Sequence, residues 1–379
     1  MKNRKAPFVY GTLAFDDYFT DRVQESIQLK NNFLNGTNTI LISPRRWGKS
    51  SLVKKAAKMA LKENKNLRIC FVDLFNVRSE QEFYENLALQ ILKNTSSRWE
   101  EMMANSKRFL GRLLPIFTVS TEPNSDFSLA MDWKELKKSP EEILNMAERI
   151  AEEKKLHIVI CIDEFQNISE FGKAQPLQKK LRSHWQTQRH CSYCLYGSKR
   201  HMMMNVFTNP SMPFYKFGEL MFLDKIGEKD WVTYIIRRFK NTGKKIGRSE
   251  AAEIARYCEN HPYYVQQLAQ QAWLRTEGTA DIETVKNAME SLTLQLSLIF
   301  QNITDTLSTP QLNLLHAIIR GEDKLTSRET LEKYRIGTSA TAIRSREALI
   351  NKEILDMPQQ KAELLDPIYK YWLQHYYFI

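Results

Sequence analysis

The chain has 379 residues, of which 42% are hydrophobic and 26% charged, and its formal net charge is +11. The length predicts two or three domains, and the composition is that of an ordinary globular protein. The sequence lacks the roughly 18 consecutive apolar residues of a membrane-spanning helix and the apolar segment of a secretory signal. We therefore expect a cytoplasmic protein with no membrane partner, in which the five cysteines are reduced and mostly buried.

The positive charge is distributed unevenly along the chain. Residues 1–150 contain 24 Lys+Arg and 18 Asp+Glu, residues 151–299 contain 21 and 16, and residues 300–379 contain 10 of each. A basic protein can bind nucleic acid or an anionic nucleotide. Because the excess lies in the first two-thirds, the C-terminal part has little net attraction for nucleic acid.

The first informative pattern lies at residues 39–50. Thr39–Ile42 predicts a buried strand, and the SPRRWGKS that follows matches the phosphate-binding pattern G-x-x-x-x-G-K-[ST], with Ser43 in place of the first Gly. A helical pattern begins directly after it. A basic surface loop is the alternative interpretation, but the strand–loop–helix context favours a phosphate-binding loop.

The residue types in this loop predict a site for ATP or ADP with Mg²⁺. Backbone N–H groups would hold a polyphosphate at the positive end of the following helix, and we expect Gly48 where a Cβ would obstruct the close turn. Lys49 would bring its charge to the β- and γ-phosphates, and Ser50 would bind Mg²⁺. The predicted nucleotide-binding residues of the loop are Pro44, Arg45, Arg46, Trp47, Gly48, Lys49, Ser50 and Ser51.

The next segment continues the alternation of helices and strands. A helix follows the loop, Leu67–Phe75 predicts a strand, and Ser79–Lys93 predicts a helix that Ser79 caps. Residues 95–138 predict no definite structure and could form a hairpin or an irregular insertion. A helix from Pro140 to about Lys155 then leads into the second motif.

The second motif is HIVICIDE, residues 157–164. Its near-continuous apolar run is typical of a parallel-sheet strand that is covered on both faces. Asp163 would bind Mg²⁺ through its water shell, and Glu164 would orient or deprotonate the attacking water. Two acids at a strand end can also be an ordinary surface feature. Their position after a phosphate-binding loop favours a hydrolytic site.

Two further strands complete the predicted sheet. Cys191–Tyr196 predicts the third, and Leu220–Leu223 the last. Ser198 follows the third strand, where ring-type ATPases place a polar sensor of the γ-phosphate. This order predicts an α/β core with a mainly parallel sheet over residues 1–226, with its site at the carboxyl ends of the strands.

The remainder of the chain predicts two smaller domains. The pattern of residues 227–300 predicts helices without strands, and these helices would form a lid. Within it, His261-Pro262 marks a junction between two helices. His261 would contact the nucleotide from the lid, or would only cap the junction. Residues 301–379 predict a winged helix with its wing at 354–365.

A DNA-reading winged helix would use the third of its helices. The candidate residues are Thr341, Arg344, Ser345 and Arg346. Winged helices also serve as packing or protein-contact modules. The zero net charge of this domain weakens the DNA interpretation, because phosphate neutralisation supplies most non-specific affinity.

In combination, these motifs resemble the archaeal-type P-loop ATPases of the STAND group, which are related to AAA+ replication initiators. The resemblance covers nearly the whole chain. It is carried by PRRWGKSSL at 44–52, IDEFQ at 162–166, YGS at 196–198, HPYYVQQLA at 261–269 and the terminal DPIYKYWL at 366–373.

The resemblance implies an ATPase core, a helical lid and a C-terminal winged helix, with slow, switch-like hydrolysis of ATP. It implies that Lys49 and Ser50 bind phosphate and Mg²⁺, and that Asp163 and Glu164 act on metal and water. Ser198 would be the sensor, and His261 with Pro262 the lid contact. Asp21-Arg22 matches a G-R-x-x-E segment near the nucleotide, with Asp in place of Gly.

The function hypothesis is an ATP-dependent switch that couples nucleotide state to the arrangement of lid and winged helix. One alternative is a DNA-associated ATPase of a mobile element or replication-initiator type, with DNA on the winged helix and the basic core surface. Another is a non-hydrolysing nucleotide-binding scaffold for a protein partner, including a second copy of the chain. The Asp163-Glu164 pair argues against a scaffold, which needs no acid to activate water.

Overall fold

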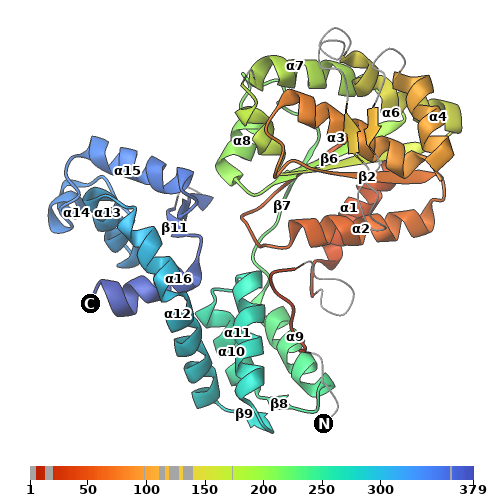
Figure 1. Ribbon diagram of the computed structural model, residues 1–379. Helices are drawn as coiled ribbons and strands as arrows, with labels where there is room; N and C mark the ends of the chain where they lie inside the picture. Colours follow the sequence, from red (N-terminus) through yellow and green to blue (C-terminus); the bar gives the residue numbers. More distant parts are fainter. Residues whose placement is uncertain are drawn as a thin grey trace. The chain divides into compact units, whose positions relative to one another are not determined.

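A computed structural model describes residues 6–12, 20–97, 99–110, 116–118, 128–130, 140–172, 174–358 and 361–379. The chain divides into two compact units. The sheet unit comprises residues 22–45 and 49–223, and the helical unit comprises residues 1–21, 46–48 and 224–379. Each unit is described by itself (Figure 1).

The sheet unit is built on five parallel strands, which confirms the predicted α/β fold. Their order across the sheet is β2-β5-β6-β1-β7. Most of them are buried apolar runs, as expected for strands covered on both faces. The strands are β1 (Thr39–Ile42), β2 (Leu67–Asp73), β5 (His157–Asp163), β6 (Cys191–Gly197) and β7 (Glu219–Phe222).

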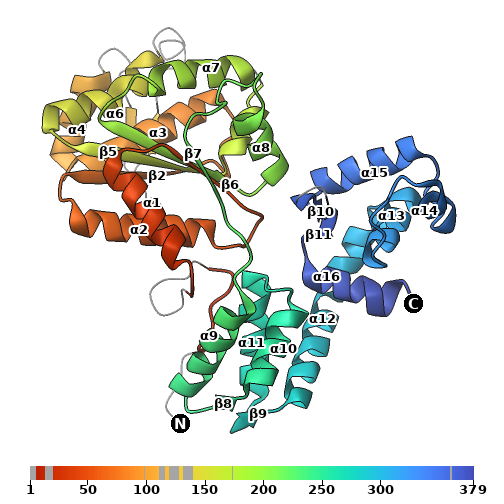
Figure 2. The same cartoon turned by 180° about the vertical axis from the view of Figure 1, so that it is seen from behind.

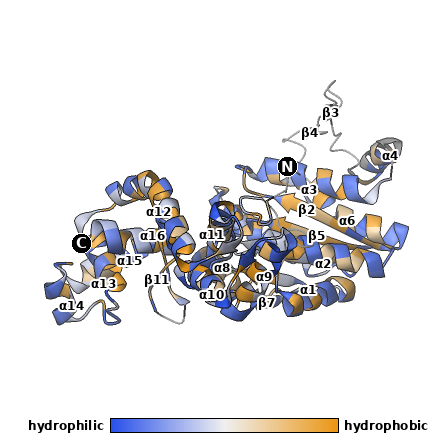
Figure 3. Ribbon diagram, turned by 90° about the horizontal axis from the view of Figure 1, so that it is seen from below, coloured by the Kyte–Doolittle hydropathy of each residue, from blue (hydrophilic) through white to orange (hydrophobic). Residues whose placement is uncertain are grey.

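Helices cover both faces of this sheet (Figures 1 and 2). One face carries α1 (Val23–Asn35) and α2 (Lys49–Glu63). The other carries α3, α6, α7 and α8, whose apolar side chains share one core with the strands. Figure 3 shows these strands as largely hydrophobic ribbons between amphipathic helices. The helix bounds are α3 (Glu80–Thr95), α6 (Glu141–Lys154), α7 (Ala174–Trp185) and α8 (Arg200–Thr208).

The described parts of residues 95–138 contain one helix that the sequence pattern did not predict. This helix, α4 (Trp99–Leu110), packs on α6, and its Met102 and Phe109 enter the core. Strands β3 (Ile116–Thr118) and β4 (Ser128–Ala130) pair antiparallel, as in the hairpin alternative. The other residues of this segment lie outside the described ranges. The Ser79 cap of α3 is confirmed, since its hydroxyl accepts from the Glu82 N–H at 3.2 Å.

The helical unit contains the predicted lid helices and the winged helix. The lid comprises α9 (Glu228–Asn241), α10 (Arg248–Tyr257), α11 (Pro262–Arg275) and α12 (Ile282–Asp305), with β8 (Lys245–Ile246) paired to β9 (Thr279–Ala280). The winged helix comprises α13 (Thr309–Ile319), α14 (Arg328–Lys333), α15 (Ser339–Asn351), the wing strands β10 (Leu355–Asp356) and β11 (Glu363–Leu364), and α16 (Pro367–Trp372).

One hydrophobic core runs through the lid and the winged helix. Polar contacts cross the same junction. Tyr264 of α11 donates its hydroxyl to the half-buried Asp366, whose carboxylate also accepts from two N–H groups at the start of α16. Lys370 of α16 pairs with Glu259 before α11. Because breaking this junction would expose both apolar surface and buried polar groups, we expect the lid and winged helix to move as one body.

Among the described residues, no helix has both the length and the apolar character needed to cross a membrane.

Candidate functional site

The predicted site residues of the sheet unit meet at one edge of the sheet. Strands β2 and β5 pair so that Asp73 lies opposite Asp163. Strand β1 pairs with β6 so that Ile42 lies opposite Gly197. The phosphate loop, which follows Ile42, Glu164, which follows Asp163, and Ser198, which follows Gly197, therefore all start from the carboxyl ends of adjacent parallel strands.

Gly48 is required by its backbone conformation and not by crowding. Its φ is +90°, a region that L-residues rarely adopt. A Cβ built at this position meets no protein atom within 4 Å, so the expected steric obstruction is wrong. Ser43 has no positive φ. The position that usually holds the first Gly therefore imposes no left-handed backbone here, which explains why serine is tolerated.

The Lys49 side chain lies against the phosphate loop and bonds the first residues of that loop. The residue is 6% exposed, and its ammonium donates to the carbonyl oxygens of Ser43 and Pro44, each at 2.9 Å. A buried ammonium is stable only with such partners. The first residues of α2 thereby bind the start of the loop, and the lysine charge lies where the motif predicts a phosphate.

Ser50 and Asp163 form the oxygen pair expected for Mg²⁺. The Ser50 hydroxyl donates to Asp163 Oδ2 at 2.8 Å, although 113 residues separate them. The pKa of Asp163 is raised to about 6, mainly by burial and also by the nearby Glu164, against the opposing Ser50 hydrogen bond. A hydroxyl and a half-buried carboxylate are hard oxygen ligands of the kind Mg²⁺ prefers, so these residues fit the metal.

Glu164 turns away from the strand and joins Ser198. It lies beyond the last residue of β5 in a left-handed conformation, with φ of 51°. Its Oε2 accepts from the Ser198 N–H at 3.1 Å, from the Ser198 hydroxyl at 3.0 Å and from Gln166 Nε2 at 2.6 Å. Three donors therefore hold one oxygen of the carboxylate beside the predicted sensor.

Gln166 and Gly197 take part in this arrangement although the sequence analysis did not single them out. Gln166 is 1% exposed, and a Cβ at Gly197 would lie 1.9 Å from its Oε1 and 3.0 Å from the Met203 sulfur. Gly197 therefore leaves the room in which Gln166 reaches Glu164. The available signal was the glutamine two residues after Glu164 in the IDEFQ motif.

Replacing Gly197 by Ala should disturb this network. The added methyl group would displace Gln166, and we expect a loss of about 1–3 kcal/mol in the free energy of unfolding. Urea unfolding of the purified variant measures this loss. Gly172→Ala is the control for adding a methyl group where space is free, because no atom lies within 4 Å of its Cβ position. Its positive φ still adds some backbone strain. Equal unfolding midpoints for Gly197→Ala and wild type would contradict the steric argument.

The tip of the phosphate loop, residues 46–48, belongs to the helical unit. The Arg46 guanidinium lies over the Tyr263 ring at 4.5 Å, and the Trp47 ring meets the His261 ring edge-on with centroids 6.3 Å apart. The pKa of His261 is lowered to about 3, mainly by burial and also by the positive charges of Lys225 and Arg46. At neutral pH its imidazole is therefore uncharged.

Two buried polar atoms at this contact lack a partner among the described residues. They are His261 Nδ1 and Trp47 Nε1. A buried polar atom without a hydrogen bond costs free energy, so such atoms are rare and point to a ligand or water. The pair fits a polar ligand next to the phosphate loop. His261 occupies the N-cap position of α11, which begins with Pro262, but its side chain makes no capping hydrogen bond.

The remaining predicted residues are placed as follows. Arg45 is exposed, Pro44 and Ser51 are buried, and Ser51 lies in the first turn of α2. Arg22 is 4% exposed and pairs with Glu25 at 2.9 Å. Asp21 has a φ of 55°. Aspartate tolerates this left-handed conformation, which explains how it can stand where a related sequence would have Gly.

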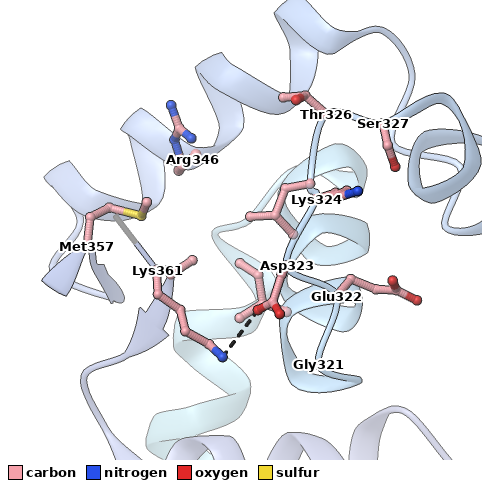
Figure 4. Close-up of a pocket in the computed structure, with 12 residues that line it drawn as sticks. Gly321, Glu322, Asp323, Lys324, Thr326, Ser327, Arg346, Met357 and Lys361 are labelled. Atoms are coloured by element: carbon pink, nitrogen blue, oxygen red, sulfur yellow. Dashed lines mark ion pairs between the residues drawn. The ribbon is translucent and has the colours of Figure 1, made fainter. Parts of the chain in front are cut away.

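One member of the predicted DNA-reading set on the winged helix is excluded. Ser345 is 6% exposed, so it cannot reach a base edge. Arg344 is exposed, whereas Arg346 lines a cavity of about 540 Å³ between the loop after α13 and the wing (Figure 4). The ion pair of Asp323 with Lys361, at 3.2 Å, crosses this cavity. The prediction for Ser345 is therefore wrong, and Thr341, Arg344 and Arg346 stay predicted DNA contacts.

The comparisons with known proteins agree with this arrangement. The family described as "Predicted AAA-ATPase" matches residues 17–208, and the one described as "Probable winged helix domain" matches residues 298–375. No protein with a curated description matches the sequence significantly.

Solved structures share the fold. A Walker-type ATPase of Pyrococcus abyssi is 16% identical, with a TM-score of 0.65 over 96% of this chain and 98% of that chain. The ORC2 protein of Aeropyrum pernix, in its ADPNP–ADP complexes, is 15% identical, with a TM-score of 0.57 over 97% and 94%. Because the sequence identities are low, these structural similarities establish the fold alone. The family match covers more than half of the residues, and the chain thus belongs to the predicted AAA-ATPase family and carries a winged helix at its C-terminal end.

Proposed function

We propose that this protein is an ATP-binding and ATP-hydrolysing molecular switch of the STAND type. The observation that carries the proposal is the convergence of Lys49, Ser50, Asp163, Glu164 and Ser198 at the carboxyl edge of one parallel sheet. Phosphate binding alone would need only the loop. A paired metal ligand, an acid and a polar sensor are the further parts that hydrolysis needs.

The proposed roles follow from the contacts of each residue. Lys49 would exchange its two loop carbonyls for phosphate oxygens, which are stronger acceptors for an ammonium. Ser50 and Asp163 would hold Mg²⁺, whose chemistry is to neutralise charge on the phosphates. Glu164 would accept a proton from the attacking water, and Ser198 would exchange its hydrogen bond to Glu164 for one to the γ-phosphate.

The Glu164–Ser198 contact gives this switch a resting arrangement. While Ser198 and Gln166 donate to the carboxylate, its lone pairs on that oxygen are occupied. A γ-phosphate that competes for the Ser198 hydroxyl would free the acid. Hydrolysis would then depend on sensing the nucleotide, as expected of a slow switch and not of a fast enzyme.

The lid side of the switch involves the loop tip. Arg46 and Trp47 contact Tyr263 and His261, and the neighbouring Tyr264 bonds Asp366 at the start of α16. A change at the loop tip would thus be transmitted to the winged helix over a few side chains. We propose a core of residues 1–226, a lid of 227–300 and a winged helix of 301–379, with the last two moving together.

A second candidate function is a DNA-associated ATPase. The net charge of +11 favours it, although the zero net charge of residues 300–379 places the attraction elsewhere than on the winged helix. A protein partner, including a second copy of the chain, stays a proposal that rests on the family resemblance.

Lys49→Ala tests nucleotide binding directly. Loss of the buried ammonium should weaken ATP binding at least about tenfold, because a charge-assisted hydrogen bond is worth roughly 1.5–3 kcal/mol. Calorimetric titration of ATP with Mg²⁺ into the full chain measures the change. Lys54→Ala, on the next turn of α2, is the matched control and should bind like wild type. Equal ATP affinity of wild type and Lys49→Ala would refute the proposed function.

A further inference from the structure

The lid carries a basic surface that the nucleotide site does not use. The segment RRFKNTGKKIGR, residues 237–248, contains six Lys and Arg and no Asp or Glu. It runs from the last turns of α9 through β8 to the first residue of α10. Two of its cations have structural roles. Arg238 is buried against the Pro7 carbonyl, and Lys244 donates to the Trp273 carbonyl at 2.7 Å.

The other four cations form what we call the lid basic surface: Arg237, Lys240, Lys245 and Arg248. All four are exposed. In the described part of the chain none of them makes an ion pair, whereas exposed cations elsewhere, such as Arg256 and Arg328, do. The nearest acids along the chain on either side are Asp230, seven residues before Arg237, and Glu250, which accepts from the Ser249 hydroxyl. The four charges are therefore not neutralised locally.

Helix electrostatics account for only part of this arrangement. Lys240 lies in the last turn of α9, where a positive charge stabilises the helix. Arg248 is the first residue of α10, where a positive charge opposes the helix dipole. Lys245 lies on a short strand and gains nothing from either helix. Two of the four cations are thus held without a stabilising role in the fold, which points to a ligand.

The side chains between these cations indicate the chemistry of that ligand. Ile246 and Phe239 are buried, so the segment exposes no apolar anchor for a protein groove or a lipid surface. It also exposes no aromatic ring on which an unpaired base could stack. Arg237 and Lys240 lie three residues apart on one helix face, and Lys245 and Arg248 follow on the adjoining turn. Unpaired cations without aromatic rings are suited to the phosphates of a duplex, which are closely spaced and need no base contact.

We infer that the lid basic surface binds the phosphate backbone of duplex DNA without sequence preference. The inference rests on the DNA-associated form of the proposed function, and it places the DNA contact on the lid instead of the winged helix. Each cation that neutralises a phosphate releases a condensed counterion, so the binding is strongly salt-dependent. The lid then carries the predicted nucleotide contact, His261 before α11, and the DNA site at the α9–α10 turn.

The test is DNA binding by the full chain over a salt series. Fluorescence anisotropy with a mixed-sequence duplex of about 30 base pairs, at roughly 50 to 200 mM salt, gives affinity and salt slope. The variant Arg237→Ala/Lys240→Ala/Lys245→Ala/Arg248→Ala should bind at least about tenfold more weakly at the middle of this range. Its slope of log K against log salt should fall in magnitude by about 0.9 for each lost contact.

Three further variants make the result specific. The control Lys62→Ala/Lys65→Ala/Lys179→Ala/Arg189→Ala removes as many exposed charges from the sheet unit and should keep most of the affinity. Arg237→Lys/Arg248→Lys conserves charge and should bind like wild type. The inference is overturned if the lid variant keeps wild-type affinity and slope, or if Arg344→Ala/Arg346→Ala on the winged helix abolishes binding instead.

ATP titration of the same samples separates this inference from the proposed function. The lid variant should bind ATP normally, because none of its four side chains contacts the phosphate loop or His261. A wild-type protein that binds ATP but no duplex refutes the lid site and leaves the switch intact. A wild-type protein that binds the duplex but not ATP refutes the proposed switch and leaves the lid site intact. A preference for a single strand or for an acidic peptide over the duplex would overturn the assignment of the ligand.

Discussion

Glu164→Gln is expected to lower the rate of ATP hydrolysis by at least about 100-fold and to leave ATP affinity nearly unchanged. A general base contributes roughly 10²–10⁴-fold to such a reaction, and an amide cannot take up the proton. The amide oxygen of Gln can still accept from the Ser198 hydroxyl and N–H, which now donate to Glu164 at 3.0 and 3.1 Å. The local structure should therefore persist, and the loss should fall on turnover.

Single-turnover phosphate release, measured beside ATP titration, distinguishes the chemical step from binding. Glu170→Gln is a suitable control, because this nearby acid is exposed and pairs with Lys199 at 3.1 Å outside the site. It should hydrolyse ATP like wild type. If Glu164→Gln turns over as fast as Glu170→Gln, Glu164 is not the base. The scaffold alternative would be favoured if the wild type itself binds ATP without turnover.

Asp163→Asn is expected to stabilise the metal-free protein and to abolish Mg²⁺-dependent hydrolysis. The pKa of Asp163 is raised from 3.8 to about 6, mainly by burial, so at neutral pH its ionisation costs more free energy in the folded state than in the unfolded chain. Folding therefore loses stability as pH rises from about 4 to about 6, since over this interval only the folded state holds the proton. Asparagine removes this cost, and we expect a gain of about 1–3 kcal/mol at pH 7.

Urea unfolding in metal-free buffer at several pH values measures the gain, and phosphate release with and without Mg²⁺ measures the loss. The stabilisation should shrink below pH 6 and vanish near pH 4. Asp73→Asn is the matched control at the end of the neighbouring strand. Its carboxylate is exposed and accepts from the Phe75 N–H, which an asparagine can also do. Equal effects of the two substitutions would show that burial at Asp163 is not the cause.

These two predictions share one physical origin. The sheet edge half-buries Asp163, whose charge is costly without a cation, and hydroxyls and an amide donate to Asp163 and Glu164 instead. A site that is strained in this way gains free energy when Mg²⁺ and phosphate arrive. The same contacts that disfavour the free protein would therefore support the bound one, as a switch requires.

The strand–loop–helix segment and the HIVICIDE strand could be predicted from the sequence because both are local patterns. A continuous apolar run predicts a covered parallel strand whatever surrounds it, and the spacing of Gly48, Lys49 and Ser50 is a property of eight consecutive residues. The lid and winged-helix helices were predictable for the same reason. Helix α4 was not, because its apolar periodicity lies within a segment whose other residues carry no pattern.

Contacts between distant segments could not be predicted. Ser50 and Asp163 are 113 residues apart, and Glu164 and Ser198 are 34 apart. Only the register of the parallel sheet brings them within hydrogen-bond distance. The burial of Ser345 and the placement of Arg346 beside a cavity likewise depend on how α15 packs, which residue types alone do not predict.

The sequence by itself determined the family of fold, the residue types of the nucleotide site and the order of the domains. These follow from short-range periodicity and motif spacing. Only the tertiary structure decided which donors hold Glu164, that Gly197 makes room for Gln166, and that lid and winged helix share one core. It also decided which cations of residues 237–248 are neutralised and which stay exposed. The physical reason is that burial and partner choice depend on packing between segments, which no local pattern encodes.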